Sequence, residues 1–302
     1  INMSKIYGIL LSIIFLLPYS NYASEIADTN SKKKLILNTG IASSAAISLI
    51  GINHVWYKNY PKTSFHLFDD FKEWNGMDKV GHVCTSYHLN HYSYLLLKKN
   101  GINKPLLKSS LYTFSYMMGV EFIDGFSTEW GFSVYDVMAN GIGSLMYASQ
   151  EKLFKKQIFK IKFSSHFSEY SSCRPSLLGE TPAQQIFKDY NGQTYWLTFN
   201  LNQLLNQKIN FFNFVDFAVG YSIDGFTGAH ENPIIATCPC HYDQCNDLER
   251  KSQFLFSLDL NTDKIKSKNK VLKFLLAPFD IVKVPFPAII INDAETFRLF
   301  YI

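Results

Sequence analysis

The sequence contains little charge for its length. Asp, Glu, Lys and Arg make up only 18% of the 302 residues, against about 25% in an average soluble domain. Hydrophobic residues reach 47% and aromatic residues 16%. This composition excludes a disordered chain, because disorder requires low hydrophobicity and high charge. It is typical of a membrane-associated protein or of a protein with a large aromatic core.

The motifs of several enzyme classes are also missing. There is no Gly-rich phosphate loop, no Gly-x-Ser-x-Gly elbow and no His-Glu-x-x-His helix. The formal net charge is +4, with no dense basic face that carries interleaved aromatics. We therefore expect neither a cofactor nor a nucleic-acid partner.

The N-terminus is typical of an export signal. We expect translation to start at Met3, followed by Lys5 and an apolar stretch from Ile9 to Leu17. Pro18 ends this stretch, and Ala23 is a small residue at the expected cleavage edge. The segment predicts a signal peptide over residues 1–23; an uncleaved anchor helix is the alternative. No Cys follows the apolar stretch, so a lipoprotein signal is not expected.

Four apolar segments with helical punctuation follow a polar leader at residues 24–34. The first segment carries no charge and is long enough to cross a bilayer, although a buried helix of a soluble protein would look similar. Gly101 and Pro105 separate the second segment from the third. The four predicted helices are Leu35–Tyr57, Asp78–Lys98, Pro105–Asp124 and Ser133–Phe154.

The second half of the chain has the alternating pattern of short strands separated by polar turns. The predicted strands cover residues 159–163, 193–200, 215–223, 253–260, 288–291 and 296–302. The expected fold class is therefore α+β. A membrane-associated four-helix bundle at residues 35–156 precedes an antiparallel β-rich region at residues 157–302, which packs on the bundle or forms a membrane-facing sheet.

Polar pairs lie on three of the otherwise apolar helices. Asp78 and His82 are four residues apart and share a helix face, as do Asp136 and Asn140. Glu121 and Asp124 are three apart. Charge inside an apolar bundle is costly unless it is paired, and it often marks a functional site. The candidate cluster is Asp78, His82, Glu121, Asp124, Glu129, Asp136 and Asn140.

The same residues have structural interpretations. Asp78 stands where a helix N-cap is expected, and residues 133–136 resemble a capping box with Asp136 in the fourth position. A metal site would use His82, Glu121 and Asp136. His88 and His91 are three apart on the second helix and are a weak metal pair. A structural network, a binding site and a catalytic or metal site all remain open.

The cysteines fit an exported protein in which disulfides form. The chain has five: Cys84, Cys173, Cys238, Cys240 and Cys245. Cys238 and Cys240 are too close in sequence to bridge each other easily, so Cys245 is the better partner for either. Zinc binding by this loop, with His241, and free thiols are the alternatives.

Several motifs together resemble the YfiM-like family, whose members are predicted periplasmic lipoproteins of unknown function. They are Asp78-Lys79-x-Gly81-His82, the acidic and aromatic run from Glu121 to Asp136, and Asn140-Gly141-x-Gly143. Residues 174–179 and 188–197 are similar to the long form of the family found in Bacteroidetes. The missing lipobox Cys departs from the pattern, so lipidation is not carried over.

A weaker similarity is to VanZ-like membrane proteins. Asp78, Lys79 and His82 begin one helix, and Asp136 with Asn140 begins a later one. The resemblances imply an exported cell-envelope protein, at the periplasmic side or the outer membrane, with a VanZ-like helical bundle. Its partners would be membrane lipid and other envelope proteins. We expect a non-enzymatic structural or interaction component; the alternative is an enzyme or binding protein for a lipid or cell-wall precursor.

Overall fold

The computed structural model describes residues 27–56, 60–206, 209–233, 248–265, 268–291 and 297–301. The chain divides into two compact units. We call residues 1–70 and 89–148 the helical unit, and residues 71–88 and 149–302 the sheet unit. The boundary between them falls within helix α3 (Met77–Lys99) and within helix α5 (Val134–Phe154).

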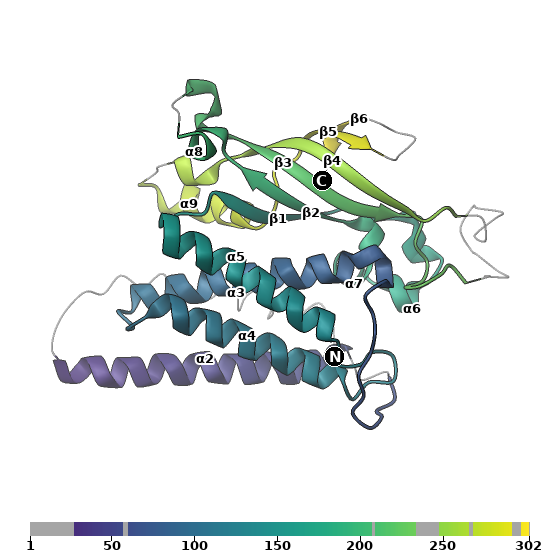
Figure 1. Cartoon of the computed structure of the whole chain (residues 1–302), viewed down its shortest axis with the longest axis horizontal. Coiled ribbons are helices and arrows are strands. Elements are labelled where there is room, and N and C mark those ends of the chain that lie inside the picture. Colours follow the sequence, from purple (N-terminus) through teal and green to yellow (C-terminus); the bar gives the residue numbers. More distant parts are fainter. Residues whose placement is uncertain are drawn as a thin grey trace. The chain divides into compact units, whose positions relative to one another are not determined.

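The helical unit is built from α2 (Ala27–Trp56), α4 (Pro105–Asp124), the C-terminal part of α3 and most of α5 (Figure 1). Pro105 occupies the first turn of α4, where its missing N–H has no helical acceptor to lose. The predicted helix limits agree with these elements to within one residue, except at the start of α2. That helix begins at Ala27, eight residues before the predicted start at Leu35, so the predicted start was wrong. Residues 27–34 contain neither Pro nor Gly, and nothing in them ends a helix.

Polar side chains hold the helical unit together from inside. The buried residues of α4 are Ser109, Thr113, Met117 and Glu121, which are four apart and lie on one face. The Asn90 amide of α3 donates to the Ser110 hydroxyl at 3.0 Å and to the Ser144 hydroxyl of α5 at 2.9 Å. Small polar residues at helix contacts allow close approach and hydrogen bonds between helices, as in membrane bundles.

Two irregular segments of the helical unit pair with each other. The amide of Phe68 donates to the carbonyl of Phe132, and the amide of Phe132 donates to the carbonyl of His66, both at 3.0 Å. The Phe65 ring lies 5.5 Å from the rings of Phe122 and Phe126. This paired aromatic connector lies between the C-terminal end of α4 and the start of α5.

The sheet unit contains one antiparallel six-stranded sheet in the order β1-β2-β3-β4-β5-β6 (Figure 1). The strands are β1 (Phe159–Ser165), β2 (Gln193–Phe199), β3 (Val215–Asp224), β4 (Lys251–Leu260), β5 (Phe286–Ile291) and β6 (Phe297–Tyr301). Just before β5, Val282 forms a bridge with Phe163 of β1. The sheet therefore curls back toward its first strand.

Short helices connect the strands of the sheet unit. The α-helices are α6 (Pro175–Leu178), α7 (Pro182–Lys188), α8 (Leu201–Leu204) and α9 (Lys270–Leu276). Short 3-10 helices cover Glu169–Ser172, Tyr190–Gly192, Asn210–Asn213, Thr262–Lys264 and Ala277–Asp280, and the segment Glu73–Gly76 before α3 forms a turn with left-handed residues. Each spans only three to seven residues, so the sheet provides most of the regular structure of this unit.

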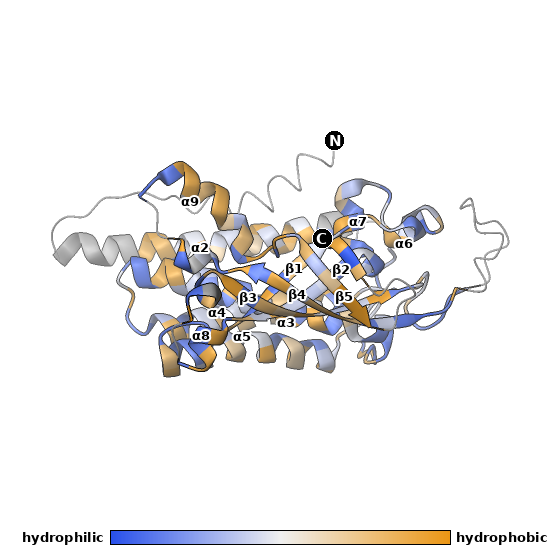
Figure 2. Ribbon diagram, turned by 90° about the horizontal axis from the view of Figure 1, so that it is seen from above, coloured by the Kyte–Doolittle hydropathy of each residue, from blue (hydrophilic) through white to orange (hydrophobic). Residues whose placement is uncertain are grey.

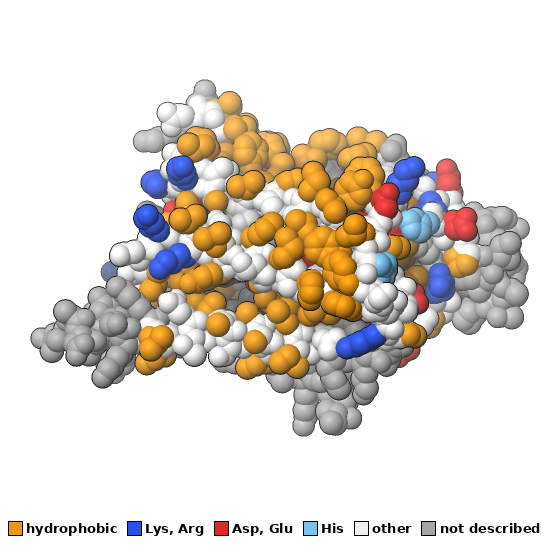
Figure 3. All heavy atoms as spheres, turned by 60° about the horizontal axis from the view of Figure 1, so that its bottom comes forward, with side chains coloured by type: hydrophobic (Ala, Val, Ile, Leu, Met, Phe, Trp, Pro, Cys, Tyr) orange, Lys and Arg blue, Asp and Glu red, His pale blue; other side chains and the backbone are white. Residues whose placement is uncertain are grey.

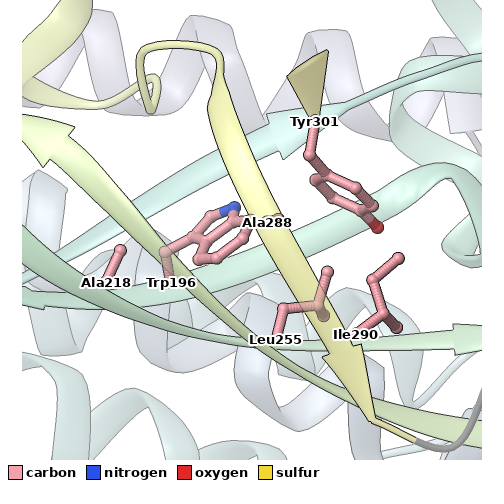
Figure 4. Packing of buried hydrophobic residues seen from close by; sticks show 6 residues of the cluster. All are labelled: Trp196, Ala218, Leu255, Ala288, Ile290 and Tyr301. Atoms are coloured by element: carbon pink, nitrogen blue, oxygen red, sulfur yellow. The ribbon is translucent and has the colours of Figure 1, made fainter. Parts of the chain in front are cut away.

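One face of the sheet encloses a small buried core. It comprises Trp196, Ala218, Leu255, Ala288, Ile290 and Tyr301 (Figure 4). The Trp196 indole N–H donates to the Ser164 hydroxyl at 2.9 Å, so its one polar group is satisfied. The Tyr301 ring meets the Trp196 ring edge-on with centroids 5.8 Å apart.

The opposite face of the sheet carries large apolar side chains, and hydropathy alternates along the strands (Figure 2). Leu197, Val219, Phe256 and Ile289 are consecutive cross-strand partners in one row. Their neighbours in sequence lie on the first face, which also buries polar side chains, including Thr198, Ser257 and Asp259. The inner face of the sheet thus buries polar side chains beside its apolar core, whereas the outer face exposes apolar side chains, unlike a typical soluble sheet, whose exposed face is polar.

The structure confirms the α+β class, with helices in the N-terminal half and an antiparallel sheet in the C-terminal half. The four-helix bundle, its association with a membrane and the domain limits at residues 35–156 and 157–302 stay predictions. The predicted signal peptide at residues 1–23 lies outside the described residues.

Candidate functional site

The seven candidate residues are distributed over both units. Asp78 and His82 belong to the sheet unit. The helical unit contains Glu121, Asp124, Glu129, Asp136 and Asn140. The predicted convergence of all seven on one site stays a prediction, and the two sets are described in turn.

Asp78 is the centre of a polar cluster in the sheet unit. The Tyr190 hydroxyl donates to its Oδ1 at 2.7 Å, and Lys79 Nζ donates to its Oδ2 at 2.9 Å. His82 Nε2 lies 3.8 Å from Oδ1. One turn along, Gly81 faces Tyr195, whose hydroxyl would be 2.9 Å from a Cβ at this position. Any larger residue at position 81 would push Tyr195 away from the cluster.

Asp78 is held as an anion by its surroundings. Burial alone would raise its pKa, but the charges of His82 and Lys79 and the hydrogen bonds from Lys79 and Tyr190 outweigh burial and lower the pKa to about 2. Burial raises the pKa of the Tyr195 hydroxyl well above its usual value, and that of the Cys84 thiol to about 12. Asp78 is therefore ionised at neutral pH, while Tyr195 and Cys84 keep their protons.

An unusual turn places Asp78 at the start of α3. Trp74, Asn75 and Gly76 have φ values of 50°, 47° and 78°, so three consecutive residues are left-handed. The turn is held because the Trp74 ring packs against Tyr190, with centroids 5.2 Å apart, and the Tyr221 hydroxyl donates to the Asn75 carbonyl at 2.7 Å. Helix α3 begins at Met77, so Asp78 lies inside its first turn; the prediction of an N-cap was wrong. A carboxylate in the first turn still stabilises the helix through its favourable interaction with the helix dipole.

The helical unit contains two separate polar contacts among the candidates. The Asn140 amide of α5 donates to Glu121 Oε1 of α4 at 3.1 Å, and both residues are buried. The Ser133 hydroxyl accepts from the Asp136 amide at 3.1 Å and donates to Asp70 at 2.6 Å. The expected Ser133 cap of the fourth helix is therefore present.

The remaining candidates have less defined surroundings. Asp124 is the half-buried last residue of α4, and Glu129 is exposed in the connector. His88 Nε2 hydrogen-bonds with the Ile161 carbonyl at 2.9 Å in the sheet unit, whereas His91 stacks edge-on against Tyr147 in the helical unit. These contacts give each histidine a structural role.

Two of the five cysteines lie within the described residues. Cys84 is a buried free thiol. Cys173 takes part in a disulfide, as an exported protein allows. The loop with Cys238, Cys240, His241 and Cys245, where a disulfide, a zinc site or free thiols are expected, lies outside the described residues.

The chemistry open to the Asp78 cluster follows from its charge state. A carboxyl with a pKa near 2 has no proton to donate at neutral pH and is a weak base. It can hold a cation or orient a neighbouring donor. The metal set predicted from His82, Glu121 and Asp136 stays a prediction.

Residues 67–149 match a family model described as a predicted periplasmic lipoprotein (DUF2279). The matched segment covers about a quarter of the chain and includes α3, α4 and most of α5. It agrees with the resemblance to a family of predicted periplasmic lipoproteins of unknown function. The match supports an exported, envelope-associated protein. Comparison with curated proteins and with solved structures gave no match.

Sequence reasoning missed the partner of Asp78. Tyr190 is 112 positions away along the chain and has no pattern of its own, although it lies in a segment noted for its family resemblance. Reasoning also missed a buried ion pair between Lys162 Nζ and Asp259 Oδ2, at 2.5 Å, beside the buried Lys283. The only signal for that pair was a lysine in an alternating strand, which normally indicates a solvent-facing residue.

Replacing Asp78 with Asn is expected to remove a pH-dependent part of the stability of the sheet unit. Because the folded pKa of Asp78 is about 2, below its ordinary value of 3.8, the ionised form stabilises the fold above pH 3.8, and this contribution disappears as the pH falls toward 2. The lowered pKa of Asp78 corresponds to a contribution of roughly 2 kcal/mol to the free energy of unfolding. Thermal unfolding of the detergent-purified protein between pH 2 and 7 should show the two proteins converging in acid.

Glu249→Gln is the matched control. Glu249 belongs to the same unit, and its side chain is 75% exposed in an ion pair with Lys251. Its loss should change the melting midpoint little at any pH. A constant difference between wild type and Asp78→Asn across the whole pH range would contradict the assigned ionisation of Asp78.

Proposed function

We propose that this protein is a membrane-anchored component of the cell envelope, whose helical unit is embedded in a bilayer and which acts as a structural or interaction component. The observation that carries the proposal is the reversed polarity of the helical unit. Its helices turn small polar side chains inward and large apolar side chains outward.

Helices α4 and α5 display the reversed polarity along their whole length within the unit. Their inner faces contain the Asn140–Glu121 contact and the Asn90–Ser144 contact. The exposed large side chains of the two helices are Leu107, Leu111, Phe114, Phe122, Val134, Tyr135, Met138, Ile142 and Leu145. A helix on the surface of a soluble domain has the opposite arrangement, so a hydrocarbon environment suits these faces better than water.

Helix α2 supplies the strongest candidate for a membrane span. Among the described residues, Leu35–Asn53 is the one helical stretch long and apolar enough to cross a bilayer, and none of it is buried. A core helix of a soluble protein would be mostly buried. Figure 3 displays apolar side chains gathered over one face, with charged side chains mainly toward its two ends.

The sheet unit presents an apolar face of its own. Phe254, Phe256, Ile289 and Ile291 are each about half exposed on the outer side of β4 and β5. This outer face supports a second contact with lipid or with an envelope partner, because exposed apolar patches of this kind mark interaction sites.

The protein is expected to stay with membranes after removal of the signal. Extraction of isolated envelopes with high salt and then with carbonate should leave it in the pellet, and detergent should release it. Both washes remove proteins held by charge alone, whereas a hydrocarbon-buried helix resists them. Complete release of the wild-type protein by carbonate would contradict the proposal.

A pair of lysine substitutions on α2 makes this test specific. Ile47 lies near the middle of the apolar stretch and Leu35 at its start, and both are exposed. A lysine at the centre of a span costs about 3 kcal/mol, whereas one at the end reaches the interface. Ile47→Lys should therefore raise the carbonate-released fraction and Leu35→Lys should not.

A second function, in which the protein binds or processes a lipid or cell-wall precursor, is favoured by one observation. Asp78 is kept ionised beside Lys79 and within 3.8 Å of His82, and such clusters are common at functional sites. Under this function, His82→Ala should impair envelope integrity, measured as antibiotic or detergent sensitivity, at unchanged protein level. A normal phenotype in a stably expressed His82→Ala strain would remove this function and leave the structural one.

A further inference from the structure

We infer that the helical unit contains a binding site for one anionic amphiphile of the membrane, with the acyl chain in an apolar pocket and the phosphate at Lys62. The inference rests on the proposed membrane location. The pocket has a volume of 430 Å³, within the range of small-molecule sites. It lies between α2, the segment of residues 60–63 and the C-terminal part of α4.

The walls of the pocket are apolar and come from two helices. Leu49 and Ile50 of α2 face Phe122 and Ile123 of α4. The Ser48 hydroxyl of α2 is 2.8 Å from the Tyr116 hydroxyl of α4, and Gly119 leaves room for Leu49. The two helices therefore approach each other closely beside the pocket. This packing forms a wall suited to a hydrocarbon chain.

The rim of the pocket is polar and is held by backbone hydrogen bonds. Lys62 and Ser127 form an isolated β-bridge, and the Thr63 amide donates to the Phe126 carbonyl at 2.9 Å. The Thr128 amide donates to the Pro61 carbonyl at 3.2 Å. The rim that carries Lys62 is therefore fixed by pairing on both sides of the bridge.

The pocket is placed where the apolar stretch of α2 ends. Asn53 is both the last residue of that stretch and part of the pocket lining. Tyr60, also in the lining, meets the Trp130 ring edge-on with centroids 4.8 Å apart. Tyr and Trp gather at the level of lipid headgroups. A lipid in the pocket would therefore place its headgroup at this level.

The charge at the rim selects an anionic headgroup. Lys62 is exposed, and within the described part of the chain its ammonium group is in no ion pair. Lysine binds phosphate as a compact point charge. Asn53 and Ser127 add uncharged polar groups to the lining, suited to glycerol or sugar hydroxyls. The site thus fits a glycerophospholipid with net negative charge better than a zwitterionic one.

Native mass spectrometry of the detergent-purified full chain tests the site. The probes are phosphatidylglycerol, phosphatidylcholine and inorganic phosphate, added at equal concentrations. The wild-type protein should retain one phosphatidylglycerol about tenfold more tightly than phosphatidylcholine, and it should not retain phosphate alone. Equal retention of the two lipids, or binding of phosphate alone, would overturn the inference.

Variants locate the lipid. Lys62→Gln should lose the preference for phosphatidylglycerol and keep weak binding of both lipids. Ile123→Trp should fill the pocket and weaken the binding of both lipids about tenfold. Leu49→Trp, on the opposite wall, should have the same effect and is the variant to use if Ile123→Trp does not fold. Leu111→Trp, on the exposed face of α4 outside the pocket, should bind like wild type. Unchanged binding in folded pocket-filling variants would overturn the site.

The outcome separates the two proposals. Protein that resists carbonate but retains no lipid overturns the pocket and leaves the membrane anchor intact. Protein that carbonate releases but that binds phosphatidylglycerol through Lys62 supports the pocket and contradicts the embedded helical unit.

Discussion

Replacing Asp259 with Ala is expected to destabilise the sheet unit by about 3–5 kcal/mol, the cost of breaking a buried ion pair from one side. Lys162 and Asp259 are 1% and 0% exposed, and their charged atoms are 2.5 Å apart. Without the carboxylate, the Lys162 ammonium would stay buried after losing its ion-pair partner. Asp259 Oδ1 also accepts the Val284 amide at 3.0 Å, so the segment before β5 would lose an acceptor.

Lys283 makes the effect larger. Burial lowers its pKa to about 8, Asp259 opposes this shift, and the charge of Lys162 adds to it. In Asp259→Ala the pKa of Lys283 should fall further. Because the pKa of Lys283 is lower in the folded chain than in the unfolded one, the unfolded chain binds more protons between these two values. The variant should therefore gain stability as the pH rises above 7.

Urea or thermal unfolding in detergent, at pH 7 and pH 9.5, measures both effects. Glu249→Ala, which breaks the exposed ion pair with Lys251 in the same unit, is the control and should cost no more than about 1 kcal/mol. A Lys162→Met, Asp259→Leu double variant should recover the part of the loss that comes from the unpaired Lys162 ammonium, because that charge is removed together with its partner. If Asp259→Ala were as stable as Glu249→Ala, the buried pair would not be a determinant of this fold.

Replacing Gly131 with Ala is expected to destabilise the helical unit by about 1–3 kcal/mol through overpacking. A Cβ at this position would lie 2.5 Å from Phe68 Cβ and 2.9 Å from His66 Nε2. Phe68 Cβ is fixed to the backbone, which pairs with Phe132 in the aromatic connector, so it cannot move away freely. The connector should open, and steady-state protein level should fall with the melting midpoint.

Gly141→Ala is the matched control. The nearest atom to a Cβ at Gly141, in the middle of α5, is Phe114 Cε2 at 3.9 Å, an ordinary contact. Ala in a helix is favoured over Gly by roughly 0.5–1 kcal/mol. The two glycine replacements should therefore change the melting midpoint in opposite directions, and a melting curve for Gly131→Ala equal to wild type would contradict the packing of the connector.

The elements of this fold follow from local sequence patterns. Pro105 and the residues near Gly101 separate two helices, and Ser133 caps the next, so their limits were predicted closely. Alternation around Trp196 and along residues 215–223 located β2 and β3. These signals depend on near neighbours, which a single sequence displays directly.

The same patterns did not predict which side chains of each element are buried or which distant residues they contact. The alternation of Lys160-Ile161-Lys162 predicts a strand but assigns lysine to solvent, whereas Lys162 is buried against Asp259 nearly a hundred positions later. In the same way Asp78 resembled a cap, and its Tyr190 partner comes from a distant segment. Such pairings depend on strand order and on what surrounds the fold, and no short-range pattern records either.

The depth of α2 in a bilayer is the most direct test of the embedded helical unit. Single spin labels are placed along Leu35–Asn53 in nanodisc-reconstituted protein, and their collision rates with oxygen and with a water-soluble nickel complex are compared. We expect a maximum of oxygen access and a minimum of nickel access near Ile47, with nickel access rising toward Leu35 and Asn53. Uniformly high nickel access along the helix would place α2 in water and contradict the account.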